Sequence, residues 1–445
     1  MTKLQSILYL IRLLKSPYLI GFYRGHIHLS DEQVNSIQDL LTSNDIELQA
    51  QIVKHYEDQF ADLVGNGYCH SFASGRMAFF SLMQSLGIGP GDEVIIPGFT
   101  CSVVPNAIFR TGAKPVYSDI DTETLGSDAS AIERCITPQT KMIVAQHSFG
   151  IPCNIDEIAD LARSKGIFLV EDSALALDSR IHGKSVGTWG DAAFFSTDHS
   201  KPLNTIIGGM LYTSHKDIFE NVKQTIGNLP NLSKNHQNNL YQQFNYERKT
   251  YIPSRYPRSI IREYLRAALC AYTGGYFRKT TAFLESDYTA QSSSSSLYPY
   301  PAKMPAFLAQ LGLFEIERWA NEKRKRKALF QEYLNYSEIA QDKIQIPNAY
   351  YEKEKEIVPL RFIFRSPQAS ALREKFEKYI DVKGMWFLDP VVCCPNGPQT
   401  MGYKNDSCVN SERVCSDILN MPCVLPEGWD KRAVSIFHDI LSASN

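Results

Sequence analysis

Three polar residues with distinct chemistry follow or end apolar segments in the first half of the 445-residue chain. Asp172 comes just after the apolar run 167–170, Ser196 ends the run 192–196, and Lys201 follows five residues later. A buried lysine has a lowered pKa and can form a Schiff base, and a serine hydroxyl can bind a phosphate oxygen. Taken singly, each has an ordinary alternative: a solvated lysine, a capping aspartate, and a serine bonded to nearby backbone.

The segment 73–76 begins a predicted helix and offers a place for an anion. Backbone N–H groups of a first helical turn lack partners within the helix, and the helix dipole adds partial positive charge. A phosphate therefore suits Ser74, Gly75 and Arg76. The Asp172 carboxylate, at a strand end, can pair with a protonated pyridine nitrogen. The cofactor pyridoxal 5'-phosphate (PLP) has such a pyridine ring, and the positive charge on its nitrogen makes it an electron sink.

These residues are expected at the edge of an α/β fold. Apolar strands alternate with amphipathic helices between about residues 70 and 215, which indicates a mainly parallel sheet covered on both faces. Ligands of such sheets bind outside the carboxyl ends of the strands. The predicted strands are Glu93–Pro97, Lys114–Ser118, Met142–Gln146, Ile167–Val170, Ala192–Ser196 and Gly209–Thr213, and the predicted helices include Met77–Leu86, Val103–Phe109 and Ile155–Ser164.

The length predicts more than one structural unit. The basic run Lys323–Lys327 is expected on a solvated helix face, and the serine run Ser292–Ser296 in a flexible segment. We expect an N-terminal helical extension over 1–45, a large α/β domain over 46–300 with a helical insertion at about 228–300, a long connecting helix within 301–350, and a small C-terminal α/β domain over 351–445.

The composition is ordinary for a globular protein. The formal net charge of −2 gives no electrostatic reason to expect nucleic acid or an anionic membrane as a partner. The ten cysteines lack the paired spacing of a zinc site, which favours free thiols in a reducing cytoplasm and no metal. The apolar run Ile7–Leu14 is too short to span a bilayer, which needs ~20 apolar residues. A basic helix there is expected to dock on the protein rather than lie on a membrane surface.

In combination, these features resemble the DegT/StrS-type sugar aminotransferases, which have the aspartate aminotransferase fold (fold type I of PLP enzymes). The resemblance covers residues 50–445 and is densest over 70–214. It implies three layers around a mainly parallel central sheet, with a smaller C-terminal α/β domain. The motifs that carry it are Ser74-Gly75, Gly87–Pro97, Gly112–Val116, Asp119–Asp121, Ile136–Lys141, His147–Gly150, Glu171-Asp172, Gly187, Gly190-Asp191, Phe195-Ser196, Lys201, Gly208-Gly209 and Asn410–Pro422.

The resemblance implies a role for each matched position. Lys201 would hold PLP as a Schiff base and then move a proton between the substrate and the cofactor. Asp172 would bind the pyridine nitrogen. Ser196 and the backbone of Gly75 and Arg76 would bind the phosphate.

The sequence departs from the family at positions that line the cofactor. Leu175 replaces a glutamine near the cofactor's hydroxyl, Cys101 replaces an aromatic ring that stacks on the pyridine, and Ile207 replaces a glutamate. Residues 301–304 replace a segment that reaches the partner subunit's phosphate. His147 also lies near the cofactor in this layout, with a structural role as the alternative. Loss of the aromatic stack or of a hydrogen bond costs about 1 kcal/mol each in cofactor affinity, which weakens the site without removing its chemistry.

The implied activity is the transfer of an amino group from an amino acid, glutamate, to a nucleotide-linked keto-sugar in glycan or secondary-metabolite biosynthesis. The implied assembly is a cytoplasmic homodimer. Two alternatives stay open. A sugar dehydratase of the same fold usually has histidine in place of the lysine, and His199 lies close to Lys201 in the sequence. A non-catalytic scaffold protein would tolerate the departures, but it would have no need of Asp172, Ser196 and Lys201 together.

Overall fold

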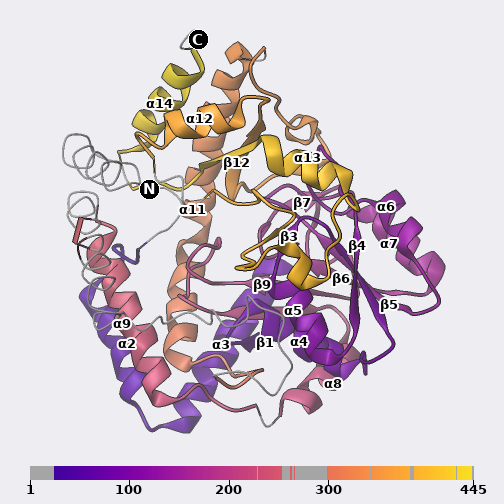
Figure 1. The fold of residues 1–445 in the computed structure, drawn as a ribbon. Coiled ribbons are helices and arrows are strands. Elements are labelled where there is room, and N and C mark those ends of the chain that lie inside the picture. The colour runs from indigo at the N-terminus through magenta and orange to yellow at the C-terminus, as the bar shows by residue number, and fades with distance from the viewer. Residues whose placement is uncertain are drawn as a thin grey trace.

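The centre of the molecule is a seven-stranded sheet. Its strands are β1 (Tyr68–Phe72), β2 (Glu93–Pro97), β4 (Lys114–Ser118), β5 (Thr140–Gln146), β6 (Phe168–Asp172), β9 (Ala192–Ser196) and β10 (Gly209–Thr213). They are ordered β1-β10-β9-β6-β5-β2-β4, and within this sheet only β10 runs antiparallel to its neighbours (Figure 1). The predicted α/β class with a mainly parallel sheet is confirmed. This computed structural model describes residues 25–227, 229–252, 261–262, 265, 298–340, 342–380, 385–426 and 428–442.

Helices cover both faces of the sheet, among them α4 (Gly75–Ser85), α5 (Val103–Thr111), α6 (Ala129–Cys135) and α7 (Ile155–Lys165). Successive side chains of a strand point to opposite faces. Val94 and Val170 accordingly pack in the cluster that contains α4 and α5, whereas Ile95 and Leu169 pack with α6 and α7. Both faces are apolar, which explains why the strands read as continuous hydrophobic runs.

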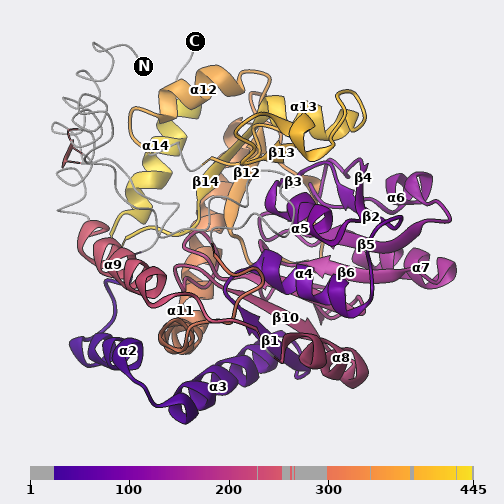
Figure 2. The same ribbon diagram turned by 60° about the horizontal axis from the view of Figure 1, so that its bottom comes forward.

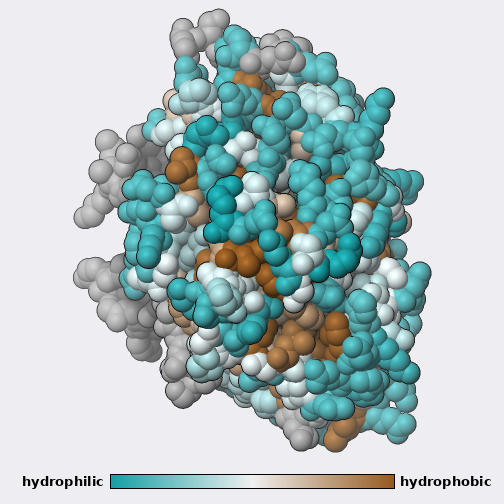
Figure 3. Space-filling model, turned by 90° about the vertical axis from the view of Figure 1, so that its right-hand side faces the viewer, coloured by the Kyte–Doolittle hydropathy of each residue, from teal (hydrophilic) through white to brown (hydrophobic). Residues whose placement is uncertain are grey.

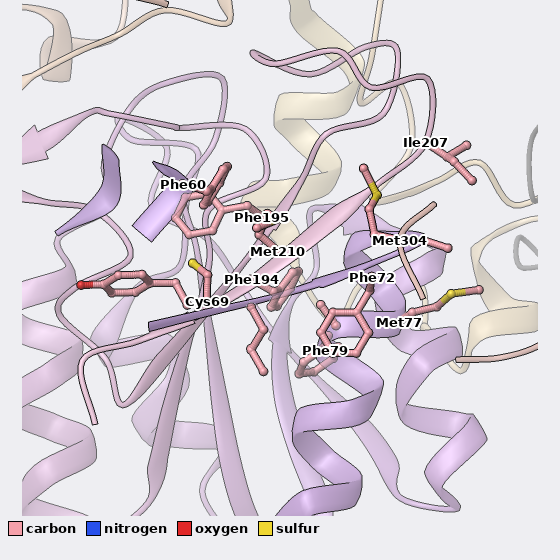
Figure 4. Packing of buried hydrophobic residues seen from close by; sticks show 14 of the residues in the cluster. Phe60, Cys69, Phe72, Met77, Phe79, Phe194, Phe195, Ile207, Met210 and Met304 are labelled. Atoms are coloured by element: carbon pink, nitrogen blue, oxygen red, sulfur yellow. The ribbon is translucent and has the colours of Figure 1, made fainter. Parts of the chain in front are cut away.

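Aromatic packing fixes the start of α4 against the end of β9. The rings of Phe79 and Phe194 stack with centroids 4.8 Å apart, and Phe60 of α3 (Ile46–Val64) meets Phe195 edge-on at 5.2 Å (Figure 4). Full burial of each such side chain contributes about 1.5–3 kcal/mol. The two backbone segments that border the candidate site are therefore held by the core beneath them.

A second hydrophobic cluster lies toward the C-terminus of the chain. Its strands β12 (Arg361–Arg365) and β14 (Ile418–Pro422) pair in antiparallel fashion. Helices α12 (Ala369–Phe376) and α14 (Asp430–Ser442) pack on them, together with the end of α11 (Ala306–Ser337). Figures 1 and 2 show α11 running from beside α3 to this second unit. The exact domain boundaries stay a prediction.

Most of the predicted elements are present with small shifts. The strands at 93–97, 114–118, 192–196 and 209–213 have the predicted bounds, and the long helix begins one residue after Pro305. The edge strand β1 was not predicted. Its sequence, Tyr-Cys-His-Ser-Phe, lacks an apolar run, and it becomes a strand by pairing with β10, more than a hundred residues away.

Several predictions fall outside the described residues: the apolar run Ile7–Leu14, the serine run Ser292–Ser296 and most of the 228–300 insertion. Two helices near these regions are described, α2 (Asp31–Thr42) and α9 (Lys234–Thr250). Among the described helices, none combines the length and the apolar character that crossing a membrane requires. The side of the molecule seen in Figure 3 is mostly hydrophilic, with apolar residues gathered in patches.

Candidate active site

Asp172 ends β6 at the carboxyl edge of the sheet, with only 5% of its surface exposed. Its Oδ1 accepts the Ala174 N–H at 3.1 Å. Burial raises the pKa of this carboxyl to about 6, while the Ala174 N–H and the charge of Lys201 oppose the rise. A cation brought against this carboxylate would favour its ionised form.

The neighbouring Glu171 fixes the backbone that carries Asp172. Glu171 is fully buried, and a buried carboxylate is tolerated only when its oxygens are hydrogen-bonded. Its two oxygens accept three backbone N–H groups, from Gly187 at 2.6 Å, Trp189 at 2.6 Å and Gly190 at 2.8 Å. The N–H groups of these glycines therefore bind the Glu171 carboxylate at the strand end rather than a ligand.

His147 uses both ring nitrogens within the protein. Its Nδ1 accepts the Cys153 N–H at 3.2 Å, so Nε2 carries the ring proton and donates to Glu171 Oε2 at 3.0 Å. The residue is completely buried. A direct contact of His147 with a cofactor stays a prediction, and the observed bonds place it behind the strand end that holds Asp172.

The start of α4 forms a cradle with the end of β9. Ser74 is the N-cap residue, and its buried hydroxyl has no hydrogen-bond partner among the described residues. A Cβ atom at Gly75 would lie 2.9 Å from the Phe195 carbonyl oxygen and 3.3 Å from Ser196 Cβ, so a glycine is needed for this approach. The Ser196 hydroxyl lies 3.5 Å from Asp198 Oδ2. An unpartnered hydroxyl at the start of a helix, where the helix dipole adds partial positive charge, suits an anion.

Lys201 lies in the loop after β9. Its backbone N–H donates to the Asp198 carbonyl at 3.0 Å, and its ammonium lies 4.7 Å from the centroid of the Trp386 ring, a cation–π contact. Burial raises the pKa of Asp198, but the charge of Lys201 brings it below its usual range. Lys201 also lowers the pKa of Asp172, so the two residues lie within electrostatic reach of each other.

A small pocket of about 20 Å³ lies beside Lys201. Two guanidinium groups share its wall, from Arg326 and Arg361, and the second lies 3.7 Å from the Trp386 ring centroid. His199 lines the same pocket. The concentration of positive charge suits an anionic substrate.

The position of Arg326 corrects one prediction. The basic run Lys323–Lys327 was expected on a solvated helix face, but Arg326 is only 3% exposed. It faces inward because it pairs with the buried Glu322 at 3.7 Å and borders the pocket. Nothing in the run distinguishes Arg326 from its neighbours, since all five residues are basic.

Two thiols meet within electrostatic reach of Lys201. Strand β3 (Thr100–Cys101) pairs in parallel with β13 (Val391–Val392), and Cys393 follows directly with a positive φ of 65°. A hydrogen bond from the Cys393 thiol lowers the pKa of Cys101 to about 7, against the effect of burial and with help from the charge of Lys201. Cys393 was not predicted as a site residue, because it lies 292 positions from Cys101 and only the pairing of β3 with β13 joins them.

The other departures from the family occupy packed apolar surroundings. Leu175 is 6% exposed and packs in a cluster with Phe99 and Phe387, whose rings stack with centroids 4.2 Å apart. Ile207 belongs to the main core, as does Met304 of the segment 301–304. At these positions apolar packing takes the place of polar groups.

The structure thus brings four predicted residues into one electrostatic group: Arg76 and Lys201 both lower the pKa of Cys101, and Lys201 lowers that of Asp172. Gly75 and Ser196 meet beside them in the cradle. Trp386, Cys393, Arg326 and Arg361 are additional residues that the sequence did not indicate.

Fold and site define the class of protein. The chain has the three-layer fold of type I PLP transferases. The crystal structure of S. venezuelae DesV in complex with a ketimine intermediate matches it with a TM-score of 0.69 at 19% identity, over 97% of this chain and 100% of that chain. Residues 28–246, just under half of the chain, match the model of the DegT/DnrJ/EryC1/StrS aminotransferase family.

Curated relatives match the same region. GDP-perosamine synthase of Escherichia coli O157:H7 is 36% identical over 192 residues, 43% of this chain and 53% of the relative. The dTDP-4-dehydro-2,3,6-trideoxy-D-glucose 4-aminotransferase of Saccharopolyspora spinosa is 38% identical over 192 residues, 43% of this chain and 50% of the relative. The matched part of the chain spans about half the length of these relatives.

Proposed function

We propose that this protein is a PLP-dependent aminotransferase that moves an amino group from glutamate, or another amino acid, to a nucleotide-linked keto-sugar. The observation that carries the proposal is that Asp172 ends β6 while Lys201 follows the adjacent paired strand β9, and that the charge of Lys201 lowers the pKa of Asp172. The family region and the names of the two curated relatives support the reaction class.

The residues present fit PLP at both of its ends. At the phosphate end, the unpartnered Ser74 hydroxyl and the close approach at Gly75 leave donors that an anion would satisfy. At the ring end, Asp172 has a pKa of about 6 and would be fully ionised beside a protonated ring nitrogen. When bound there, PLP supplies an electron sink for the carbon next to the substrate nitrogen.

Lys201 has two tasks in the proposed reaction. Its Nζ would hold the cofactor through the aldehyde carbon, and the free amine would accept and return the substrate proton. Asp198 and the Trp386 ring hold the amine beside the pocket. Asp172 would keep the ring nitrogen protonated.

The proposed substrates are anionic. A nucleotide-linked sugar carries a diphosphate, and glutamate carries two carboxylates. Arg326 and Arg361 in the pocket wall support such ligands, because guanidinium groups bind phosphate and carboxylate through paired hydrogen bonds.

The proposed setting is a homodimer in the cytoplasm, acting in polysaccharide biosynthesis. All nine cysteines of the described ranges are free, which supports a reducing compartment. Light scattering would test the assembly: a PLP-loaded dimer should have about twice the chain mass of 50.3 kDa. An active monomer would contradict the dimer but leave the chemistry untouched.

Glutamate alone tests the reaction class. PLP-loaded protein mixed with glutamate should release one equivalent of 2-oxoglutarate and convert the cofactor to its amine form, which a keto-sugar nucleotide would reverse. Lys201→Ala should release none, whereas Lys216→Ala, on the exposed start of α8 (Lys216–Ile226), should behave as the unchanged protein. PLP binding without any release of 2-oxoglutarate would favour a dehydratase or a scaffold protein.

A further inference from the structure

Two histidines and a glutamate converge next to the pocket of Lys201. His26 and His28 precede α2, and Glu315 lies on α11, the helix against which α2 packs (Figure 2). One donor atom from each of the three residues lies within 4.8 Å of the other two. Their side chains are 1%, 16% and 5% exposed, respectively.

The separations match those of metal ligands. His26 Nδ1 and His28 Nε2 lie 3.4 Å and 3.1 Å from the same atom, Glu315 Oε1. Charge-assisted hydrogen bonds are usually about 2.7–2.9 Å long. Tetrahedral zinc, with bonds of about 2.0–2.2 Å, holds neighbouring ligand atoms roughly 3.3 Å apart or slightly more. The two histidine–glutamate separations therefore fit ligands of one ion, and the two histidine donor atoms lie within 4.8 Å of each other.

The burial of His26 is a second observation that points to a bound ion. Neither of its ring nitrogens has a hydrogen bond among the described residues, although the side chain is 99% buried. An unsatisfied buried polar group costs about 1–3 kcal/mol. The ring packs on Phe244 with centroids 5.2 Å apart, which holds Nδ1 toward Glu315. Coordination through Nδ1 would remove part of this cost.

We propose that His26 Nδ1, His28 Nε2 and Glu315 Oε1 bind a divalent transition-metal ion, with zinc as the best match. Imidazole and carboxylate are common zinc ligands, and three protein ligands leave the fourth position for water or a ligand. The ion would pin the segment before α2 to α11. Because Glu315 also lines the pocket of Lys201, the ion would lie beside that pocket.

Arg318 is the competing cation. Its NH1 lies 3.6 Å from Glu315 Oε1, and its side chain is 27% exposed. Removing this positive charge should tighten metal binding. Arg318→Gln thus changes the affinity in the direction opposite to the loss of a ligand, which separates a metal site from a simple ion pair.

Metal titration of the full chain without an affinity tag tests the proposal. After treatment with a chelator, the protein should bind one Zn²⁺ in calorimetry, and added Co²⁺ should show the visible absorption of tetrahedral nitrogen and oxygen ligation. His28→Gln should weaken binding by at least on the order of 100-fold, since even groups behind a ligand contribute 10–100-fold. Arg318→Gln should strengthen it.

His438→Gln is the matched control, because His438 is a partly exposed histidine on α14. It should leave binding unchanged. Absence of binding, equal binding by His28→Gln, or cobalt absorption typical of thiolate ligands would overturn the proposal. The cobalt spectrum of the unchanged protein decides the matter even where a variant fails to fold.

Discussion

The two walls of the candidate active site are built in different ways. On one wall, Asp172, Ser196 and Lys201 lie at or just after strand ends, each next to the apolar run that carries it. On the other wall, Trp386 and Cys393 come from a segment that joins the large sheet through the short pairing of β3 with β13. The first wall is fixed by the core of the large domain, and the second depends on long-range contacts.

This difference separates the roles that we assign. Groups that act on the cofactor should lie on the rigid wall, because their chemistry needs fixed geometry. The assembled wall carries Cys101, one of the departures from the family, and Trp386, whose ring contacts Arg361. Changes on the first wall should therefore affect the reaction more than changes on the second.

The largest effect is expected at Asp172. Asp172→Asn would no longer keep the ring nitrogen protonated, and the rate of glutamate conversion should fall about 10²–10³-fold, as for other preorganised electrostatic groups. Cys101→Ser, on the other wall, should change the rate by less than about tenfold. Single-turnover kinetics with glutamate measures both, and equal losses would erase the distinction between the walls.

The same substitution should stabilise the cofactor-free protein. Asp172 has a pKa of about 6 when folded and about 4 when unfolded, so between these values the folded state binds more protons. Stability therefore falls as the pH rises from about 4 to 6 and stays lower above. Asp172→Asn should raise the free energy of unfolding by up to about 3 kcal/mol at pH 8 and by almost nothing at pH 4. Urea unfolding at both pH values checks this, and a pH-independent gain would contradict it.

Gly75 should show the tightness of the cradle. In Gly75→Ala the new Cβ would lie 2.9 Å from the Phe195 carbonyl oxygen, and this overpacking should cost about 1–3 kcal/mol in stability. Gly227→Ala is the control, because its nearest neighbour would lie 3.6 Å away and the change should stay within about 0.5 kcal/mol. Thermal unfolding measures the stability of both variants. Equal losses of stability would mean that the start of α4 can shift to make room for the methyl group.

The smallest effect concerns the second wall. Cys101 has a pKa of about 7, so its alkylation by iodoacetamide should reach half its maximal rate near pH 7. Cys393→Ala removes the hydrogen bond that lowers this pKa and should slow the reaction at pH 7 about tenfold. Cys423, whose burial raises its pKa, should stay unreactive throughout. Peptide mapping reads out each thiol, and an unchanged rate at Cys101 would show that the thiol pair has no influence.

The sequence predicted the first wall well and the second poorly. Local hydrophobic runs locate β6 and β9, and therefore Asp172 and Ser196, because each strand end directly follows its apolar residues. Cys393 has no comparable local signal, since its place depends on a pairing across 292 positions. The His26, His28 and Glu315 cluster was also not predicted. Cysteine spacing cannot indicate it, because its ligands are histidines and a glutamate from two distant segments.

Identification of the lysine that holds PLP is the most direct test of the whole account. PLP-loaded protein would be reduced with borohydride, digested, and examined by mass spectrometry for the modified residue. We predict a single pyridoxyl group, carried by Lys201. A label on another lysine, or no label on protein that visibly binds PLP, would contradict the assignment of this site.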